Sequence, residues 1–198
     1  MDIEIEAKFL NCTHEDIRQK LRSIGAHCEF PMRLMRRAII DYPDRRLQTS
    51  IPNSYIRVRD EGDKTTLTYK QFDSLSVDGA REIEVVVDSF QKTVDVFTAV
   101  GLEVVSMQES KRETWKYKEC EVVLDEWPWL NPYIEIEGES EENLKDLATK
   151  LELRWTDAVF GDVMVAYRAQ YPHLTAEQTI GKLPEVRFNT PLPAFFTE

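Results

Sequence analysis

The sequence has 198 residues, 42% of them hydrophobic and 31% charged, which is enough to close one substantial core. Its formal net charge of −11 argues against binding to nucleic acid, because affinity for a phosphate backbone comes mainly from lysine and arginine. The three cysteines have no CxxC spacing, which predicts reduced thiols and a cytoplasmic location. No apolar run approaches the length of a membrane span, so we expect no membrane partner.

Alternation of apolar and polar residues with a period of two dominates the chain. It predicts strands at residues 2–9, 37–42, 54–60, 64–71, 80–88, 103–108, 110–118, 120–126 and 132–138. Helical patterns lie at 14–24, 89–100 and 140–152, and a fourth lies at about 157–170. Candidate N-caps for the first three helices are Thr13, Ser89 and Ser140. Many strands with a few inserted helices predict an α+β fold on an antiparallel sheet or barrel.

We expect one domain at residues 1–172, including its C-terminal helices, followed by a proline-rich arm at 173–198. The arm ends with Ala194-Phe195-Phe196, and it is expected to lie over the barrel or to contact a partner. The segment Trp127-Pro128-Trp129 has two interpretations, a buried loop anchor or a surface that stacks on a ligand.

Charged residues recur on one face of several predicted strands. Successive side chains of a strand point to opposite faces, so Glu4, Glu6 and Lys8 share one face and Ile3 and Ile5 the other. On a single strand such a face would be an ordinary solvated surface. The same pattern recurs at Arg57 and Arg59, Thr68 and Lys70, Glu82 and Glu84, Asp125, and Glu135 and Glu137. The recurrence leaves two arrangements, one in which the apolar faces form a central core and the charged faces point outward, and one in which the sheet closes with its charged faces inward. Periodicity alone does not decide between an open and a closed sheet.

A closed sheet of this kind would collect about seven carboxylates and at least four cations in its lumen. Buried charges cost several kcal/mol each unless they are paired or bound to an ion, so the lumen must hold an ionic ligand. Clustered carboxylates suit Mg²⁺ or Mn²⁺, whereas arginine and lysine suit the oxygens of a polyphosphate. The pattern predicts a polyanion bridged between protein cations and bound metal.

These motifs resemble those of the CYTH superfamily, the triphosphate tunnel metalloenzymes, which includes class IV adenylyl cyclases, thiamine triphosphatases and inorganic triphosphatases. The ExExK signature of that family matches Glu4-Ile5-Glu6-Ala7-Lys8. Further matches follow in order at Arg57-Val58-Arg59, Leu67-Thr68-Tyr69-Lys70, Arg81-Glu82-Ile83-Glu84, Arg112, Asp125 and Glu135-Ile136-Glu137. The resemblance covers residues 1–138, and the helical segment to about 170 is also similar to family members.

The resemblance implies a closed antiparallel eight-stranded β-barrel, the triphosphate tunnel, with helices packed outside. It implies that the substrate is bound by Lys8, Arg57, Arg59, Lys70 and Arg112. It implies Mg²⁺ or Mn²⁺ at two sites, held by Glu4, Glu6, Asp125, Glu135 and Glu137. Glu82 and Glu84 would be further ligands, water-orienting groups or partners of a tunnel arginine. The catalytic set would comprise Glu4, Glu6, Lys8, Lys70, Glu82 and Glu84.

Two positions depart from the family pattern. Members often have Lys-x-Arg where this chain has Ser110-Lys111-Arg112, so the first lysine is absent and we expect Lys111 on the opposite face. Members also often have an aromatic before Phe-Asp-Thr-Pro-Asp, whereas here Ile39-Ile40-Asp41-Tyr42-Pro43-Asp44 moves the aromatic. A role for that tyrosine in selecting products does not carry over.

The predicted function is divalent-metal-dependent hydrolysis of a triphosphate, either inorganic triphosphate or a nucleoside or thiamine triphosphate. One alternative is a class IV adenylyl cyclase, which would convert ATP to cyclic AMP and pyrophosphate. Another is a non-catalytic module that binds polyphosphate. The expected partner is a triphosphate-containing small molecule, and a homodimer is compatible with the sequence.

Overall fold

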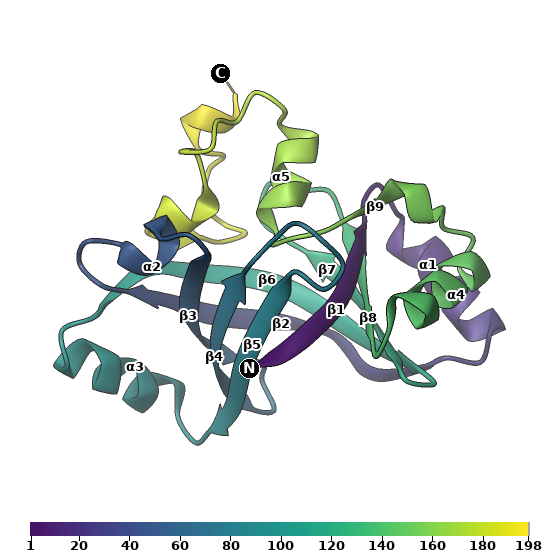
Figure 1. The fold of residues 1–198 in the computed structure, drawn as a ribbon, viewed down its shortest axis with the longest axis horizontal. Coiled ribbons are helices and arrows are strands. Elements are labelled where there is room, and N and C mark those ends of the chain that lie inside the picture. Colours follow the sequence, from purple (N-terminus) through teal and green to yellow (C-terminus); the bar gives the residue numbers. More distant parts are fainter. Residues whose placement is uncertain (198) are drawn as a thin grey trace.

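The computed structural model describes residues 1–197, in which eight antiparallel strands form a closed barrel (Figure 1). The barrel strands are β1 (Asp2–Phe9), β2 (His27–Asp41), β3 (Asn53–Asp60), β4 (Thr65–Phe72), β5 (Ala80–Val87), β6 (Glu103–Tyr117), β7 (Cys120–Glu126) and β8 (Tyr133–Gly138). Their order around the barrel is β1-β5-β4-β3-β2-β6-β7-β8, and pairing of β8 with β1 closes the ring. The predicted α+β fold with a closed barrel is confirmed.

Short elements surround the barrel (Figure 1). β9 (Ala158–Val159) pairs with β1, and β10 (Glu185–Val186) pairs in parallel with β6. The helices are α1 (His14–Ser23), α2 (Arg46–Thr49), α3 (Phe90–Ala99), α4 (Glu141–Lys150) and α5 (Met164–Gln170). Among the residues described, no helix has the length and apolar character needed to cross a membrane.

Two of the predicted caps are made. The side chains of Ser89 and Ser140 accept hydrogen bonds from the backbone N–H groups of Lys92 and Asn143, at 3.3 and 3.2 Å. Thr13 precedes α1 but its hydroxyl contacts the Asp16 carboxylate instead of a backbone N–H. These caps fix where α3 and α4 begin on the outside of the barrel.

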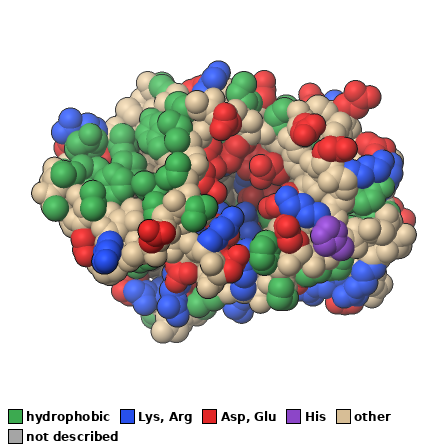
Figure 2. All heavy atoms as spheres, turned by 90° about the horizontal axis from the view of Figure 1, so that it is seen from below, with side chains coloured by type: hydrophobic (Ala, Val, Ile, Leu, Met, Phe, Trp, Pro, Cys, Tyr) green, Lys and Arg blue, Asp and Glu red, His purple; other side chains and the backbone are tan. Residues whose placement is uncertain are grey.

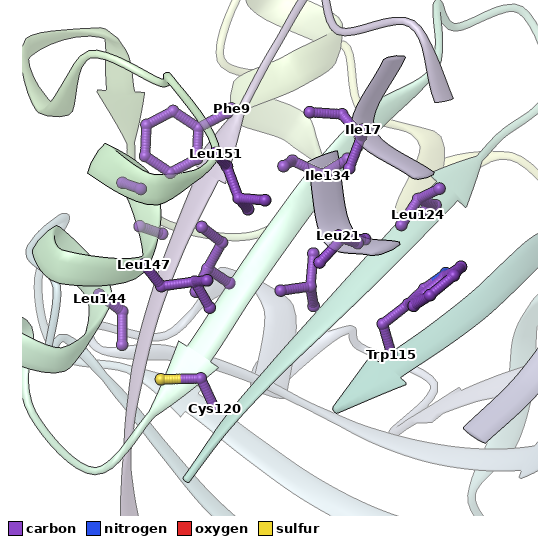
Figure 3. Packing of buried hydrophobic residues seen from close by; sticks show 14 residues of the cluster. Phe9, Ile17, Leu21, Trp115, Cys120, Leu124, Ile134, Leu144, Leu147 and Leu151 are labelled. Carbon is purple, nitrogen blue, oxygen red and sulfur yellow. The ribbon is translucent and has the colours of Figure 1, made fainter. Parts of the chain in front are cut away.

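The apolar faces of most strands point outward and are covered by helices, whereas Ile83 and Val85 on β5 stay about half exposed. Figure 3 shows α1 and α4 packed against β1, β6, β7 and β8. The labelled residues of this cluster are Phe9, Ile17, Leu21, Trp115, Cys120, Leu124, Ile134, Leu144, Leu147 and Leu151. On another part of the barrel, Val94 of α3 packs with Ala38, Ile40 and Val58 of β2 and β3. The core therefore lies outside the barrel, which leaves the lumen to polar side chains.

The short elements α2, β9 and β10 were not predicted, and β2, β6 and α5 differ from their predicted ranges. β2 begins at His27, ten residues before the predicted strand at 37–42, because its register shifts between Cys28, Phe30 and Arg33 obscure the alternation. The predicted strands 103–108 and 110–118 form one strand, β6, whose pairing with β2 continues through Glu109. The predicted helix 157–170 is helical only from Met164, because Gly161 has a φ of 116° that a helix cannot accommodate.

Candidate functional site

The barrel encloses a cavity of about 1220 Å³. Figure 2 shows acidic and basic side chains gathered around a central hollow. All of the site residues predicted from the sequence line this cavity, namely Glu4, Glu6, Lys8, Arg57, Arg59, Lys70, Glu82, Glu84, Arg112, Asp125, Glu135 and Glu137. The closed sheet therefore brings together side chains that are up to 133 positions apart in the sequence.

Carboxylates and arginines are concentrated on opposite sides of the lumen. In a closed ring of eight strands each strand faces the fourth one along, so β8, β1 and β5 face β3, β2 and β6. The first three strands form what we call the acidic wall, with Glu4, Glu6, Glu82, Glu84, Glu135 and Glu137. The other three form the basic wall, with Arg37, Arg57, Arg59 and Arg112. A ligand in the lumen is therefore placed between negative and positive surfaces.

Two lysines pair with the acidic wall. Lys8 Nζ lies 3.0 Å from Glu6 Oε1 and 3.3 Å from Glu135 Oε1. Lys70 Nζ contacts Glu4 and lies 3.6 Å from Glu6 Oε2. Burial disfavours the charge of both lysines, but the surrounding carboxylates outweigh it and raise the pKa of Lys8 and of Lys70. Both lysines therefore stay cationic inside the barrel.

The acidic wall keeps a surplus of negative charge despite these lysines. Glu137 lies directly opposite Glu6 on β1 and Glu121 on β7, and like charges in such positions repel. Partial desolvation in the cavity, followed by the charges of Glu4, Glu121 and Glu6, raises the pKa of Glu137 to about 7. Desolvation and the charge of Glu4 likewise raise the pKa of Glu82 to about 7, against the attraction of Arg57.

This surplus fits a divalent cation. Oxygen donors from carboxylates are what Mg²⁺ and Mn²⁺ prefer, and a bound cation would relieve the repulsion around Glu137 and Glu82. Within residues 1–197, no three His, Cys, Asp or Glu side chains already converge on one ion position. The reason lies in the ion pairs, because Glu4, Glu6 and Glu135 are drawn toward Lys8 and Lys70.

Arg112 forms an ion-pair network with two carboxylates. Its Nε donates to Asp125 Oδ1 at 2.7 Å, and its Nη2 contacts Asp125 Oδ2 and lies 3.2 Å from Glu135 Oε2. The hydroxyl of Tyr133 lies 3.4 Å from both carboxylates. Although burial disfavours its charge, Asp125 and Glu135 raise the pKa of Arg112. In this structure Asp125 and Glu135, both predicted metal ligands, are partners of an arginine.

The two arginines of β3 also have carboxylate partners. Arg57 Nη2 lies 3.1 Å from Thr68 Oγ1 and 3.4 Å from Glu84 Oε2. Arg59 Nε donates to Glu61 Oε1 at 2.8 Å. Glu84 thus takes the arginine-partner position that was one of its predicted roles. Both guanidinium groups border the cavity and could exchange a carboxylate for another oxyanion.

Glu61, Arg37 and Tyr133 are among the lining residues that the sequence pattern did not predict. Glu61 continues the alternation of Arg57 and Arg59 just beyond the predicted strand end, so the pattern contained a signal for it. Arg37 is the first residue of the predicted strand 37–42 and faces the lumen with Ile39. The aromatic residue Tyr133 gave no charge signal, because its contact with Asp125 and Glu135 depends on the fold.

At both departures from the family pattern, the residue in question lies outside the cavity lining. Lys111 points away from the cavity, with Nζ 3.3 Å from Glu126 Oε2, as the alternation predicted. Tyr42 also stays outside the cavity lining, and the guanidinium of Arg46 lies 4.1 Å from its ring centre. Asp41 accepts hydrogen bonds from two backbone N–H groups of α2 and so fixes that helix.

The C-terminal segment contributes to the cavity as well. α5 and residues 173–197 lie together on one side of the barrel (Figure 1). Lining residues from this part of the chain include Asp162, Arg168, Thr179 and Lys182. Trp127 borders the cavity and packs in one buried cluster with Ile180, Val186 and Phe196 of the segment. Trp129 donates to the backbone oxygen of Thr190 at 3.0 Å, so this loop anchors the C-terminal segment.

A family model described as the CYTH domain matches residues 2–156. A candidate adenylate cyclase from Vibrio parahaemolyticus is 15% identical, with a TM-score of 0.71 over 84% of this chain and 98% of that one. A candidate adenylyl cyclase from Hippeastrum with a dominant triphosphatase activity is 17% identical, with a TM-score of 0.57 over 86% and 96% of the two chains.

A protein from Pyrococcus horikoshii OT3 is 22% identical, with a TM-score of 0.65 over 79% of this chain and 94% of that one. At these identities the three likenesses show a shared fold. No curated protein matches the chain.

Proposed function

The chain belongs to the CYTH domain family, and from that premise we propose that it hydrolyses a linear triphosphate with the help of a divalent metal ion. The observation that carries the proposal is the opposition of the acidic and basic walls across one lumen. A polyphosphate with a bound cation is the ligand whose charges match both walls at once. The triphosphatase activity of the Hippeastrum protein supports the same reaction class.

The substrate would be bound by Arg57, Arg59, Arg112, Lys8 and Lys70. Each side chain already borders the cavity and pairs there with a carboxylate. On binding, phosphate oxygens would replace part of these carboxylate contacts, so the cations exchange one oxyanion for another at little desolvation cost. The arginines supply planar two-point contacts and the lysines point charges.

The metal would be held by carboxylates of the acidic wall. Glu4, Glu6 and Glu137 are the members that the surplus charge favours, and Asp125 and Glu135 complete the proposed set. A bound Mg²⁺ or Mn²⁺ neutralises phosphate charge and makes a coordinated water more acidic. Glu82 and Glu84 lie next to Arg57 and would orient water or substrate from the β5 side.

Product analysis tests this proposal. The protein is incubated with inorganic triphosphate, ATP or thiamine triphosphate under Mg²⁺ and under Mn²⁺, and orthophosphate, pyrophosphate and cyclic AMP are resolved. We expect orthophosphate as the main product with at least one substrate and none after chelation of the metal. Cyclic AMP and pyrophosphate as the main products would identify a cyclase instead. Tight triphosphate binding without turnover under either metal would identify a binding module.

A further inference from the structure

One arginine of the basic wall differs from the others. Arg37 on β2 is only 5% exposed, yet among residues 1–197 it makes no ion pair with a carboxylate. Its Nη2 contacts the hydroxyl of Ser110, and its Nε has no hydrogen-bond partner. Arg57, Arg59 and Arg112 each pair with a carboxylate by contrast. A buried guanidinium that lines a cavity and lacks an anion has an open position for one.

Neighbouring arginines add to the uncompensated positive charge at Arg37. Arg59 lies directly across from it on β3, and like charges in that arrangement repel. Burial, followed by the charges of Arg57, Arg59 and Arg112, lowers the pKa of Arg37 to about 9. An anion in the lumen would reduce the repulsion among all four arginines. The free protein therefore carries an unfavourable charge arrangement that a ligand can relieve.

Arg37 is also restrained in position. Its guanidinium carbon lies 4.3 Å from the centre of the Trp127 ring, within the range of a cation–π interaction. Trp127 is buried in a cluster with Ile180, Val186 and Phe196. The C-terminal segment thus holds the tryptophan, and the tryptophan restricts the arginine. A restrained guanidinium loses less conformational freedom when it binds a phosphate than a mobile one does.

The absence of the family lysine at position 110 indicates a function for Arg37. Lys111 does not supply the missing charge, because its Nζ lies 3.3 Å from Glu126 Oε2 and 4.8 Å from the ring centre of Phe188, away from the cavity. Ser110 is buried and its hydroxyl contacts Arg37. The guanidinium of Arg37 on β2 therefore lies where a longer side chain at position 110 of β6 would enter the lumen.

We infer that Arg37 binds a phosphate group of the substrate in place of the lysine that is absent at Ser110, and that Trp127 positions it. The inference rests on the proposed function only for the polyphosphate nature of the ligand, and it does not require hydrolysis. Arg37 would contact the substrate directly. Trp127 and the C-terminal segment would act through Arg37.

Binding of inorganic triphosphate to Arg37→Gln tests the inference. Affinity is measured calorimetrically for the full chain, with Mg²⁺ and separately with a chelator, so that turnover is not needed. A charge-assisted contact predicts that Kd rises roughly 10- to 100-fold. Arg36→Gln is the matched control, because it removes the same charge from the exposed outer face of the same strand. Its Kd should equal that of the wild type.

One further variant and one melting measurement separate binding from folding. Ser110→Lys in the Arg37→Gln background should recover most of the lost affinity, because it restores a cation at the same place. Without ligand, Arg37→Gln should melt at a higher temperature than the wild type, since it removes a buried charge that lacks a counter-ion. A lower melting temperature combined with unrecovered affinity would assign Arg37 a structural role and overturn the inference.

A double-mutant cycle tests the role of Trp127. Trp127→Leu removes the aromatic face and should raise the Kd for triphosphate in the wild-type background but not in Arg37→Gln. Trp127→Phe retains an aromatic ring and should preserve most of the affinity. Equal effects of Trp127→Leu in both backgrounds would contradict a positioning role.

The outcomes distinguish this inference from the proposed function. If the wild type binds triphosphate without hydrolysing it and Arg37→Gln binds weakly, the inference stands and the proposed function fails. If Arg37→Gln binds and hydrolyses triphosphate as the wild type does, the inference fails and the proposed function stands. If the wild type binds no triphosphate under either condition, both fail.

Discussion

The acidic and basic walls of the barrel are built in the same way but keep excess charges of opposite sign. Each takes alternate side chains from three adjacent strands, and each includes counter-ions, Lys8 and Lys70 on one side and Asp125 and Glu61 on the other. Glu137 keeps a raised pKa among carboxylates, whereas Arg37 has a lowered one among arginines. Ion pairs of Arg57 with Glu84 and of Arg112 with Glu135 join the two walls, but among the described residues neither Glu137 nor Arg37 has an ion-pair partner. A ligand that carries both signs of charge can satisfy both walls, which a simple anion or cation cannot.

The largest expected effect comes from the acidic wall. Glu137→Gln removes a carboxylate that makes no ion pair among the described residues, so it leaves no cation without a partner. If the carboxylate holds the metal, loss of several kcal/mol of charge stabilisation lowers kcat/KM for the hydrolysed triphosphate about 1000-fold. Steady-state kinetics over a range of Mg²⁺ concentrations measure this.

The control for Glu137→Gln is Glu139→Gln, which makes the same change at an exposed position outside the cavity lining. Its kinetics should match those of the wild type. Equal activity of Glu137→Gln and Glu139→Gln would remove Glu137 from the metal site.

The next effect concerns stability on the basic wall. Arg112→Gln breaks the enclosed pair with Asp125 and leaves that carboxylate buried without its cation. We expect the free energy of unfolding to fall by about 3 kcal/mol. Lys111→Gln breaks a more exposed pair with Glu126 and should cost less than about 1 kcal/mol. Denaturant unfolding of both variants measures the difference, and similar losses would show that the Arg112 network adds no special stability.

A smaller effect is expected for substrate affinity at Arg57. Arg57→Gln removes one phosphate-binding guanidinium and should raise the Kd for inorganic triphosphate about 30-fold. Arg81→Gln is the control, because Arg81 pairs with Asp73 and does not line the cavity. Calorimetric titration without turnover measures both. An unchanged Kd for Arg57→Gln would place the phosphates elsewhere in the lumen.

The smallest effect is a dependence of stability on pH. The pKa values of Glu82 and Glu137 are raised from 4.5 to about 7 in the folded protein. Between these values the folded state binds more protons than the unfolded state, so the stabilising contribution is full below about pH 4.5 and is lost as pH rises through 7.

Denaturant unfolding at a series of pH values in a chelator should therefore show the wild type losing stability relative to Glu82→Gln/Glu137→Gln across this window. Added Mg²⁺ should reduce the loss, because a bound cation favours the ionised carboxylates. Parallel stability curves for the two proteins would contradict the raised pKa values.

The barrel and most of the charged residues that its strands contribute to the lining could be predicted because one local rule repeats along the chain. Alternation placed Glu4, Arg57 and Glu135 on the charged faces of their strands, and the order of these residues pointed to the family, whose barrel turns those faces inward. The first part of β2 was not predicted because its register shifts interrupt the alternation. Such irregularities depend on pairing with β6, which a local pattern does not contain.

The lack of a counter-ion at Arg37 could not be predicted from the sequence, for a different reason. Its lack of a carboxylate depends on Ser110, 73 positions away, and on Trp127, which is itself held by residues near the C-terminal end. An inward-facing arginine can be predicted from alternation, but whether a counter-ion faces it follows only from which strands become neighbours. The same holds for Tyr133 between Asp125 and Glu135.

The position of β1 affects how the protein is made on the ribosome. β1 pairs with β5 through Asp2, Ile3 and Glu4 and with β8 through Ile5 to Phe9. A nascent chain that has not yet emerged as far as Gly138 cannot close the ring, although it already carries Glu6 and Lys8. Glu6 and Lys8 therefore acquire their environment in the lumen only after β8 has been synthesised and pairs with β1.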